Sequence, residues 1–351
     1  MMTIGGDSHK KTHTSVAVDD LGRKVAVKTV AATTGGHLDA IRWAAQWPER
    51  RWALEDCRHL TRRLESDLLK VGDEVVRVPP GLMAAERRGA REVGKSDPID
   101  AMSVARAALR EPDLPSARLD GEARQLKLLV DHREDLVAER TRMQSRLRWH
   151  LHELMPEHTV APKALNRWVV LTDIEQRLAA VDGMVADIAA ELVGRIRELT
   201  KRINDLEREI AKIVRRLAPT LLDLAGCGVL SAAKIVAEVA GVDRFKSRAA
   251  FARWNGCAPI PVWTGSERFR LNRGGNRQAN AALHRITITQ WRGVGNDGRS
   301  YILRRLDKGD TKTSAIRALR RHISDEVFKR LQADLHTAQH PAHLHTAPIA
   351  A

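Results

Sequence analysis

The chain has little cysteine, few aromatic residues and no long apolar run. Its 3 cysteines, Cys57, Cys227 and Cys257, lie far apart, which matches neither a disulfide framework nor a set of zinc ligands. No apolar run approaches the roughly 20 residues of a membrane-spanning helix, and the N-terminus lacks the apolar core of a signal peptide. We therefore interpret the cysteines as structural thiols and expect a cytoplasmic protein with no membrane partner.

Aromatic residues make up 4% of the chain, with 8 Trp, 4 Phe and 1 Tyr. This scarcity argues against a single-strand binder that lines a groove with exposed rings. Most of the tryptophans considered stand in apolar helical settings, where we expect them in the core, and only the role of Trp263 stays open. The tryptophans expected in the core are Trp149, Trp168, Trp254 and Trp291.

Positive charge is what the chain has in excess. Lys and Arg number 59 against 44 Asp and Glu, a formal net charge of +15 at pH 7. Such a field favours polyanions, and counterion release makes their binding salt-dependent. Nucleic acid is therefore the leading partner, which suggests a nucleoid-associated protein, although a basic balance alone also fits an anionic membrane surface.

Changes of periodicity predict three folded regions and a tail. Residues 1–115 alternate strands and helices, with carboxylates at strand ends and on a late helix, which fits a ribonuclease H-like mixed sheet of the α/β class. Residues 116–218 are predicted to form long coiled-coil helices, and residues 219–334 a mainly helical domain. Residues 335–351 have no apolar period and are expected to be disordered.

The clearest periodicity is an uninterrupted a/d heptad seam in the middle region. Such a seam must be covered, either by the earlier helix around 126–154 folding back or by a second subunit. The sequence does not decide between the two, and we favour an antiparallel hairpin that also serves assembly. The seam consists of Leu192, Ile196, Leu199, Ile203, Leu206, Ile210, Ile213 and Leu217.

Four carboxylates form the strongest candidate site. Asp7 and Glu55 stand near predicted strand ends, while Asp97 and Asp100 share one face of a helix start. Carboxylate oxygens are the ligands that Mg2+ prefers, and two such ions can activate a nucleophile and stabilise a leaving oxygen. Each acid also has an ordinary explanation, as a solvated strand end or as part of the helix cap over 96–100. Their combination favours a metal site.

Two separate blocks of residues carry a family resemblance. The first contains Gly-Gly-Asp7-Ser-His-Lys-Lys-Thr-His, Ala53-Leu54-Glu55 and Gly94-Lys-Ser-Asp97-Pro-Ile-Asp100-Ala. The second contains Leu224-Ala-Gly226-Cys-Gly228, residues 245–259 and Arg270-Leu-Asn-Arg273-Gly-Gly275-Asn276-Arg277. In order and spacing, over about residues 3–334, they resemble the DEDD transposases of the insertion-sequence 110 family.

The resemblance implies a chemical role for each block. The first implies a domain of the Holliday-junction resolvase type whose four acids, here Asp7, Glu55, Asp97 and Asp100, bind Mg2+. The second implies a transposase domain whose serine attacks the DNA phosphodiester and forms a covalent link. That serine position falls on Thr264 in this chain, with Ser266 as the second candidate. The Thr-Gly-Ser segment is also an ordinary turn sequence, and an inactive copy stays open.

Candidate contacts to nucleic acid lie near both blocks. The Gly226-x-Gly228 spacing before an apolar helix is that of helix-hairpin-helix elements, which present N–H groups to a phosphate, although a glycine helix cap explains it equally well. A basic and amide-rich cluster follows the candidate hydroxyls, and its ordinary interpretation is a solvated loop. The candidates are Lys95, Gly226, Gly228, Arg268, Arg270, Arg273, Asn276 and Arg277.

The sequence therefore predicts a DNA transposase or recombinase of an insertion sequence, acting on DNA with Mg2+ as a homo-oligomer. In characterised members of the family, an RNA from the element's own flanks pairs with both DNAs, which the resemblance extends to this chain. One alternative is a Mg2+-dependent, structure-selective junction nuclease without a covalent intermediate, whose activity survives loss of Thr264 and Ser266. The other is a catalytically silent nucleic-acid-binding protein.

Overall fold

A computed structural model describes most of the chain as two compact units, Met1–Asp120 and Gly121–Ala351. The described residues are 1–89, 94, 96–111, 114, 116–118, 121–263, 265, 267–272, 274–293 and 296–340, without the side chains of 58, 267 and 268. The predictions at Lys95, Thr264, Ser266 and Arg273, and those for residues 341–351, lie outside the described residues.

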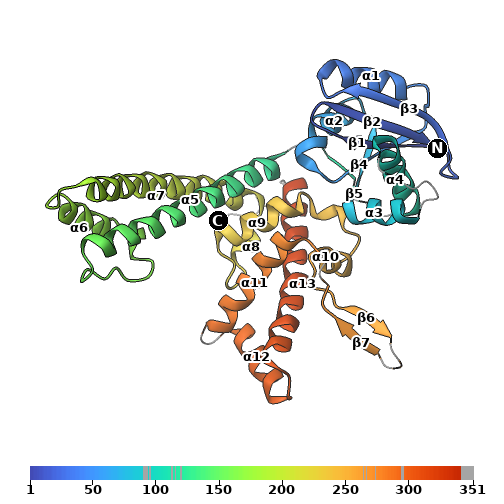
Figure 1. The fold of residues 1–351 in the computed structure, drawn as a ribbon. Coiled ribbons are helices and arrows are strands. Elements are labelled where there is room, and N and C mark those ends of the chain that lie inside the picture. The colour runs from blue at the N-terminus through green and yellow to red at the C-terminus, as the bar shows by residue number, and fades with distance from the viewer. Residues whose placement is uncertain are drawn as a thin grey trace, which may run out of the picture. The chain divides into compact units, whose positions relative to one another are not determined.

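The first unit is built on a five-stranded mixed sheet (Figure 1). Its strands are β1 (Met2–Ser8), β2 (Thr12–Val18), β3 (Lys24–Ala31), β4 (Arg50–Glu55) and β5 (Glu74–Val78), in the spatial order β3-β2-β1-β4-β5. β2 is antiparallel to β1 and β3, whereas β4 is parallel to β1 and β5. This arrangement confirms the predicted ribonuclease H-like sheet.

Helices cover both faces of this sheet. The helices are α1 (Thr34–Ala44), α2 (Arg58–Lys70), α3 (Pro80–Gly89) and α4 (Asp97–Arg110). Trp52 and Leu54 of β4 are buried in one cluster with Leu64 of α2, whereas Ala53, between them, is buried in another cluster with Val104 of α4. Successive residues of β4 thus serve opposite faces, as the period of a strand requires.

Helix α4 approaches β1 very closely at Gly5. A Cβ atom on Gly5 would lie 2.1 Å from the carbonyl oxygen of Ala101 and 2.8 Å from the Cβ of Ala105. Alternate residues of a strand point to the same face, so Asp7, two residues further on, also points to the face that α4 covers. The absent side chain at Gly5 therefore lets the start of α4 approach the end of β1.

The second unit begins with a helical hairpin of α5 (Glu122–Leu154) and α7 (Met184–Leu217), joined by η1 (Ala164–Asn166) and α6 (Trp168–Leu178). The two long helices run antiparallel side by side, since ion pairs link Glu122 to Arg216 near one end and Glu139 to Arg195 nearer the other (Figure 1). The heptad seam is buried from Leu192 to Ile210. The helix over 122–154 therefore covers this seam within one chain.

The rest of the second unit is mainly helical. Its elements are α8 (Pro219–Leu222), α9 (Val229–Val239), η2 (Val242–Arg244), α10 (Arg248–Trp254), β6 (Ile260–Trp263), β7 (Glu267–Arg270), α11 (Arg277–Arg292), α12 (Asp297–Asp307) and α13 (Lys312–Gln339). Helix α9 is buried along most of its length, in a core with Phe251, Leu283 and Ile286. Strands β6 and β7 form an antiparallel hairpin that the sequence had not indicated.

Two expectations about the second unit are wrong. Helix α13 continues to Gln339, so residues 335–339 are helical rather than disordered. Trp149 and Trp168 are 77% and 48% exposed, so neither lies in the core. Within the part of the chain that the structure describes, no helix combines the length and apolar character needed to cross a membrane.

Candidate metal centre

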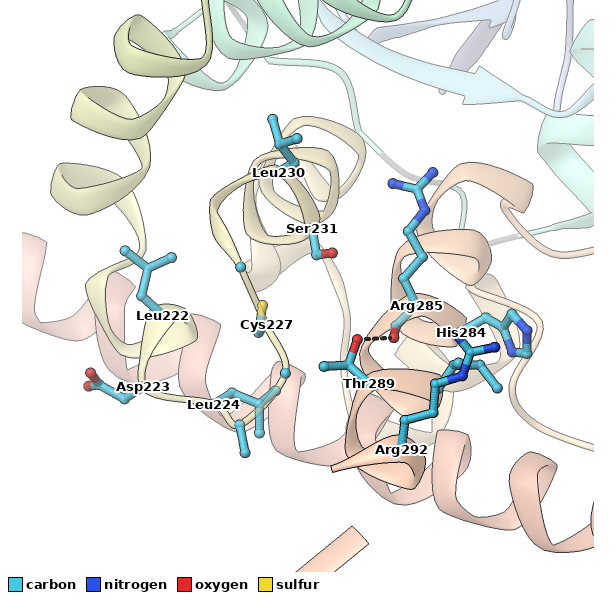
Figure 2. Close-up of a pocket in the computed structure, with 14 residues that line it drawn as sticks. Leu222, Asp223, Leu224, Cys227, Leu230, Ser231, His284, Arg285, Thr289 and Arg292 are labelled. Carbon is cyan, nitrogen blue, oxygen red and sulfur yellow. Dashed lines mark hydrogen bonds between the residues drawn. The ribbon is translucent and has the colours of Figure 1, made fainter. Parts of the chain in front are cut away.

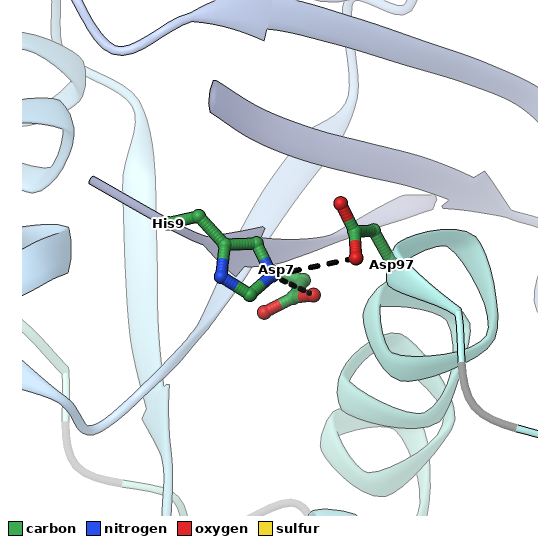
Figure 3. Close-up of side chains that lie close together, drawn as sticks. All are labelled: Asp7, His9 and Asp97. Carbon is green, nitrogen blue, oxygen red and sulfur yellow. Dashed lines mark hydrogen bonds and ion pairs between the residues drawn. The ribbon is translucent and has the colours of Figure 1, made fainter. Parts of the chain in front are cut away.

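The end of β1 and the start of α4 bring three side chains together, those of Asp7, His9 and Asp97 (Figure 3). One potential ligand atom from each lies within 4.8 Å of the others. The Nε2 atom of His9 lies 3.1 Å from Oδ2 of Asp7 and 3.4 Å from Oδ1 of Asp97, so the imidazole bridges two carboxylates. Asp7 is buried, whereas His9 and Asp97 are about half-exposed, which leaves the cluster open on one side.

Glu55 and Asp100 border this cluster. Gly6 of β1 pairs with Leu54 of β4 in parallel register, so Asp7 and Glu55 follow as neighbours at two adjacent strand ends. Asp100 is buried in the first turn of α4, where Nη1 of Arg87 donates a hydrogen bond to its Oδ1 at 2.8 Å. Among the described residues, the compact group contains Asp7, His9 and Asp97, and neither Glu55 nor Asp100 belongs to it.

The cluster is electrostatically unfavourable for its buried acid. Burial raises the pKa of the Asp7 carboxyl, His9 lowers it, and the charges of Asp100 and Asp97 raise it again, for a net increase. A bound cation would offset both the lost hydration and the repulsion between carboxylates. The environment of Asp7 therefore suits a positively charged ligand.

Cys57 lies in the same negative field. Burial, followed by the charges of Glu55 and Asp7, raises the pKa of its thiol to about 12. A thiol with such a pKa stays protonated at neutral pH, and only the thiolate is a good nucleophile or metal ligand. Without a bound metal, the Cys57 thiol is therefore a weak nucleophile and a weak ligand, and it does not belong to the group of Asp7, His9 and Asp97.

The donor set fits a hard divalent cation. Carboxylate oxygens from Asp7 and Asp97, with Glu55 and Asp100 beside them, are ligands that suit Mg2+ or Mn2+. His9 is the residue that the sequence analysis missed as a site member. Its signal was its position two residues after Asp7, just beyond the end of β1, from which its ring reaches both Asp7 and Asp97.

The predicted nucleic-acid residues of the second unit occupy several different places. Gly226 lies in the loop before α9 with φ +78°, and Gly228 is the N-cap of α9. Arg270 of β7 lines a cleft of about 390 Å3 together with arginines of α12 and α13. Those arginines are Arg305, Arg317, Arg320 and Arg321. Arg277 is exposed at the first position of α11.

Asn276 has a structural role that the sequence analysis did not consider. Its side-chain oxygen accepts a hydrogen bond from the N–H of Ala279 at 2.8 Å, which caps α11. Its amide nitrogen donates to Oε2 of Glu238 at 2.8 Å. Nearby, a Cβ on Gly275 would lie 2.3 Å from the nitrogen of Gly256, so this glycine allows two loops to touch. Gly275 and Asn276 thus hold a loop in place.

The candidate hydroxyls belong to the connection between β6 and β7. Thr264 and Ser266 follow Trp263, the last residue of β6, and precede Glu267, the first of β7. Trp263 is 75% exposed and Phe269 is 62% exposed, so this hairpin presents two aromatic rings to solvent. Trp263 therefore does not belong to the core, which answers the question that the sequence left open.

Fold and site together define a ribonuclease H-like domain with an acidic centre at the end of its first strand. The chain belongs to the insertion-sequence 110 family of transposases. A DEDD transposase model of this family matches residues 4–156, and a model of the IS116/IS110/IS902 transposase family matches residues 218–302. The resemblance inferred from the sequence motifs is thereby confirmed.

Two relatives come from bacterial insertion elements. The insertion element IS116 uncharacterized 44.8 kDa protein of Streptomyces clavuligerus is 32% identical over 154 residues, which are 44% of this chain and 39% of that protein. The insertion element IS900 uncharacterized 42 kDa protein of Mycobacterium paratuberculosis is 25% identical over an alignment of 405 positions, which covers 96% of this chain and 97% of that protein.

Among solved structures, T. thermophilus RuvC in complex with a Holliday junction substrate is similar to part of this chain. The likeness covers 31% of this chain and 94% of that chain, at 14% sequence identity and a TM-score of 0.25. The fold class therefore rests on the strand order and pairing of the sheet itself.

Proposed function

We propose that this protein is a DNA transposase that cuts and rejoins the strands of an insertion sequence, using a Mg2+-binding acidic centre and a hydroxyl nucleophile. The observation that carries the proposal is the meeting of Asp7 and Asp97 within 4.8 Å, at the end of β1 and the start of α4. Membership of a transposase family supports the same chemistry. The net charge of +15 suits a DNA substrate.

Each acid has a distinct place in this proposal. Asp7 and Asp97 hold the cation, and Glu55 and Asp100 complete its oxygen ligands. When bound, the cation supplies Lewis-acid stabilisation of the scissile phosphate and its leaving oxygen. Arg87 acts as a positioning residue, because its charge-assisted hydrogen bond to Asp100, at 2.8 Å, fixes that carboxylate on α4.

The proposed nucleophile is the hydroxyl of Thr264, or that of Ser266. The hydroxyl loses its proton to solvent as its oxygen bonds to phosphorus, while the bond from phosphorus to the leaving oxygen of the DNA breaks and that oxygen takes up a proton. Protein and DNA are then linked through a phosphodiester. The secondary hydroxyl of Thr264 is more crowded than that of a serine, so the two residues must be tested side by side.

Basic residues of the second unit are proposed to hold the DNA backbone. Arg270 shares its cleft with four arginines of α12 and α13, and this concentration of charge supports the role. The other proposed contacts are Lys95, Gly226, Gly228, Arg268, Arg273 and Arg277.

Because strand exchange needs two DNA segments at once, we propose that the protein acts as a homo-oligomer. From its family membership we propose that an RNA of the element guides it.

A denaturing gel tests the proposed reaction. The protein is incubated with Mg2+, the DNA ends of its element and the flanking transcript, as wild type, Thr264→Ala and Ser266→Ala. Ser300→Ala, a loss of an exposed hydroxyl on α12, is the matched control. We expect a covalent protein–DNA band that one of the two test variants abolishes. Cleavage without such a band, unchanged in both variants, would identify a junction nuclease, and binding without any cleavage a silent binding protein.

A further inference from the structure

A second cleft lies within the unit of residues 121–351, between the loop that leads into α9 and one face of α11 (Figure 2). Its volume is about 1020 Å3. One wall consists of residues 222–228 and the first turn of α9, and the other carries Arg285, Thr289 and Arg292 of α11. No feature of the sequence had joined these two segments into one site.

The two walls are fixed against each other. Gly226 has φ +78°, and a Cβ there would lie 3.1 Å from the carbonyl oxygen of Ile286 and 3.2 Å from the Cβ of Thr289. Next to it, the side-chain amide of Gln290 donates a hydrogen bond to the carbonyl of Ala225 at 2.7 Å. The loop therefore has a defined position on α11, and the cleft is formed before a ligand arrives.

The α9 wall offers hydrogen-bond donors that lack acceptors. Gly228, the N-cap, has no side chain to accept the N–H groups of the first turn, such as those of Val229 and Leu230. Ser231 is nine-tenths buried, and its hydroxyl has no hydrogen-bond partner among the described residues. Figure 2 shows this hydroxyl directed from α9 towards α11. These donors and the positive end of the helix suit an anion.

The α11 wall adds positive charge. Arg285 and Arg292 are exposed, and within the described part of the chain no acid forms an ion pair with either. They stand two helical turns apart on one face, about 10 Å along the axis, so they suit two separate anionic groups better than one. Burial and the charge of Arg320 lower the pKa of His284, which therefore adds little charge at neutral pH. Figure 2 shows the carboxylate of Asp223 pointing away from α11.

We propose that this cleft binds the sugar-phosphate backbone of duplex DNA. One phosphate accepts hydrogen bonds from the first turn of α9, from Ser231 and from Arg285, and a neighbouring phosphate of the same strand pairs with Arg292. Contacts of this kind fix the position of a duplex without selecting its sequence. The inference rests on the proposed function for the choice of DNA, but it is independent of the metal centre and of the proposed nucleophile.

Binding of a fluorescein-labelled duplex of arbitrary sequence tests this site. Anisotropy is measured in EDTA over a range of KCl concentrations, so that no cleavage occurs. Each phosphate contact contributes about eightfold to affinity at 0.1 M salt and about 0.9 to the slope of log K against log salt. The double variant Arg285→Ala/Arg292→Ala should bind about 60-fold more weakly, with a slope smaller by about 1.8.

Controls distinguish the loss of this site from a general loss of positive charge. Lys212→Ala/Arg215→Ala removes two exposed charges from α7 in the same unit and should change affinity far less. Arg285→Lys/Arg292→Lys keeps the charges and should retain most of the salt slope, which guards against misfolding of the alanine variant. Ser231→Val should weaken binding severalfold, and Ser231→Thr should restore it.

Three results would overturn the proposal. They are unchanged binding in the double alanine variant, an equal loss in the α7 control, and a loss of binding to duplex RNA with duplex DNA unaffected. Because the assay contains EDTA, it stands apart from catalysis. If no covalent protein–DNA band forms but the double alanine variant binds duplex DNA more weakly, the proposed function is contradicted and this site is supported. If the band forms normally but duplex binding is unchanged in that variant, the proposed function is supported and this site is contradicted.

Discussion

Helices α4 and α9 begin in the same way, but charged side chains of opposite sign surround their first turns. In each, the N-cap residue, Ser96 or Gly228, makes no side-chain hydrogen bond to the first turn. Helix α4 then places Asp97 and Asp100 in that turn, whereas α9 has no acid there and faces Arg285 across its cleft. Both helices present a positive end, yet one gathers carboxylates and the other gathers cations.

The difference shows what decides the ligand at a helix start. The macrodipole amounts to about half a positive charge, which one carboxylate outweighs. At α4, the negative charges of two acids, together with that of Asp7, make the site suited to a cation. At α9, bare N–H groups and Arg285 keep the site suited to an anion. Substitutions that exchange these features should exchange the ligands.

The largest effect is expected for Asp97→Asn, which removes one charge from the acidic helix start. Mg2+-dependent strand cleavage should fall about a thousandfold, because about 4 kcal/mol of transition-state stabilisation is lost. Single-turnover cleavage rates give the measurement, and duplex binding in EDTA should not weaken. Asp297→Asn, at the first-turn acid of α12, is the matched control. An equal loss of rate in that control would remove the special role of α4.

A smaller effect, on the Mg2+ requirement of cleavage, is expected for His9→Ala. His9 bridges Asp7 and Asp97, so its removal should raise the Mg2+ concentration for half-maximal cleavage about 10- to 100-fold, the usual cost of losing a partner of metal ligands. The rate at saturating Mg2+ should stay close to that of the wild type, and His59→Ala, on the exposed surface of α2, should behave as wild type. A lower rate at saturation with an unchanged metal requirement would instead give His9 a direct part in the reaction.

Stability provides the third test, through Asp7→Asn. Burial raises the pKa of Asp7, so the folded state holds this proton more tightly than the unfolded state does. The stability of the metal-free protein should therefore decline as pH rises from the ordinary pKa of an aspartate through the raised one. At pH 7, Asp7→Asn should stabilise the metal-free protein against urea.

Mg2+ should stabilise the wild type more than it stabilises Asp7→Asn. A concentration ten times the wild-type Kd should stabilise the wild type by about 1.4 kcal/mol and Asp7→Asn by about 0.4 kcal/mol or less. Urea unfolding with and without Mg2+ measures the change in the free energy of unfolding of each protein. If Mg2+ stabilised the two proteins equally, the cation would bind away from Asp7.

The smallest effect on stability is expected where α9 is made to resemble α4. Gly228 has φ −76°, and a Cβ there would meet no atom within 4 Å, so Gly228→Asp fits the fold and should stabilise α9 by about 0.3 kcal/mol through capping. The same carboxylate would occupy the first-turn N–H groups and repel phosphate. Duplex affinity should fall about eightfold, whereas Gly228→Ala should change it little. Unchanged affinity in Gly228→Asp would show that α9 does not face the backbone.

The acidic centre could largely be predicted from the sequence. The succession of strands and helices indicated a ribonuclease H-like sheet, and the observed pairing of β1 with β4 places Asp7 and Glu55 at adjacent strand ends. The close approach of α4 depends on Gly5, whose contact with Ala101 involves residues far apart in the sequence. His9 went unrecognised because a histidine just beyond a strand has many ordinary roles, and only its distance to Asp97 gives it one here.

The cleft beside α9 could not be predicted in the same way. Arg285 and Arg292 look like an ordinary solvated face of α11, and only the loop held against α11 at Gly226 turns that face into a wall. Similarly, the heptad seam specified a buried stripe on α7 but not the helix that covers it. Trp149 shows what a local sequence pattern cannot predict. It has apolar neighbours in its helix, but the face of the helix on which it lies is open to solvent.

Binding of Mn2+, followed by the loss of the free-ion electron paramagnetic resonance signal, tests the central claim most directly. The metal-free wild type is compared with Asp7→Asn, Asp97→Asn and the control Asp297→Asn. The account predicts that wild type and control bind with the same Kd, and that the other two bind at least about tenfold more weakly. Equal binding by all four proteins would contradict a metal centre at the meeting of β1 and α4.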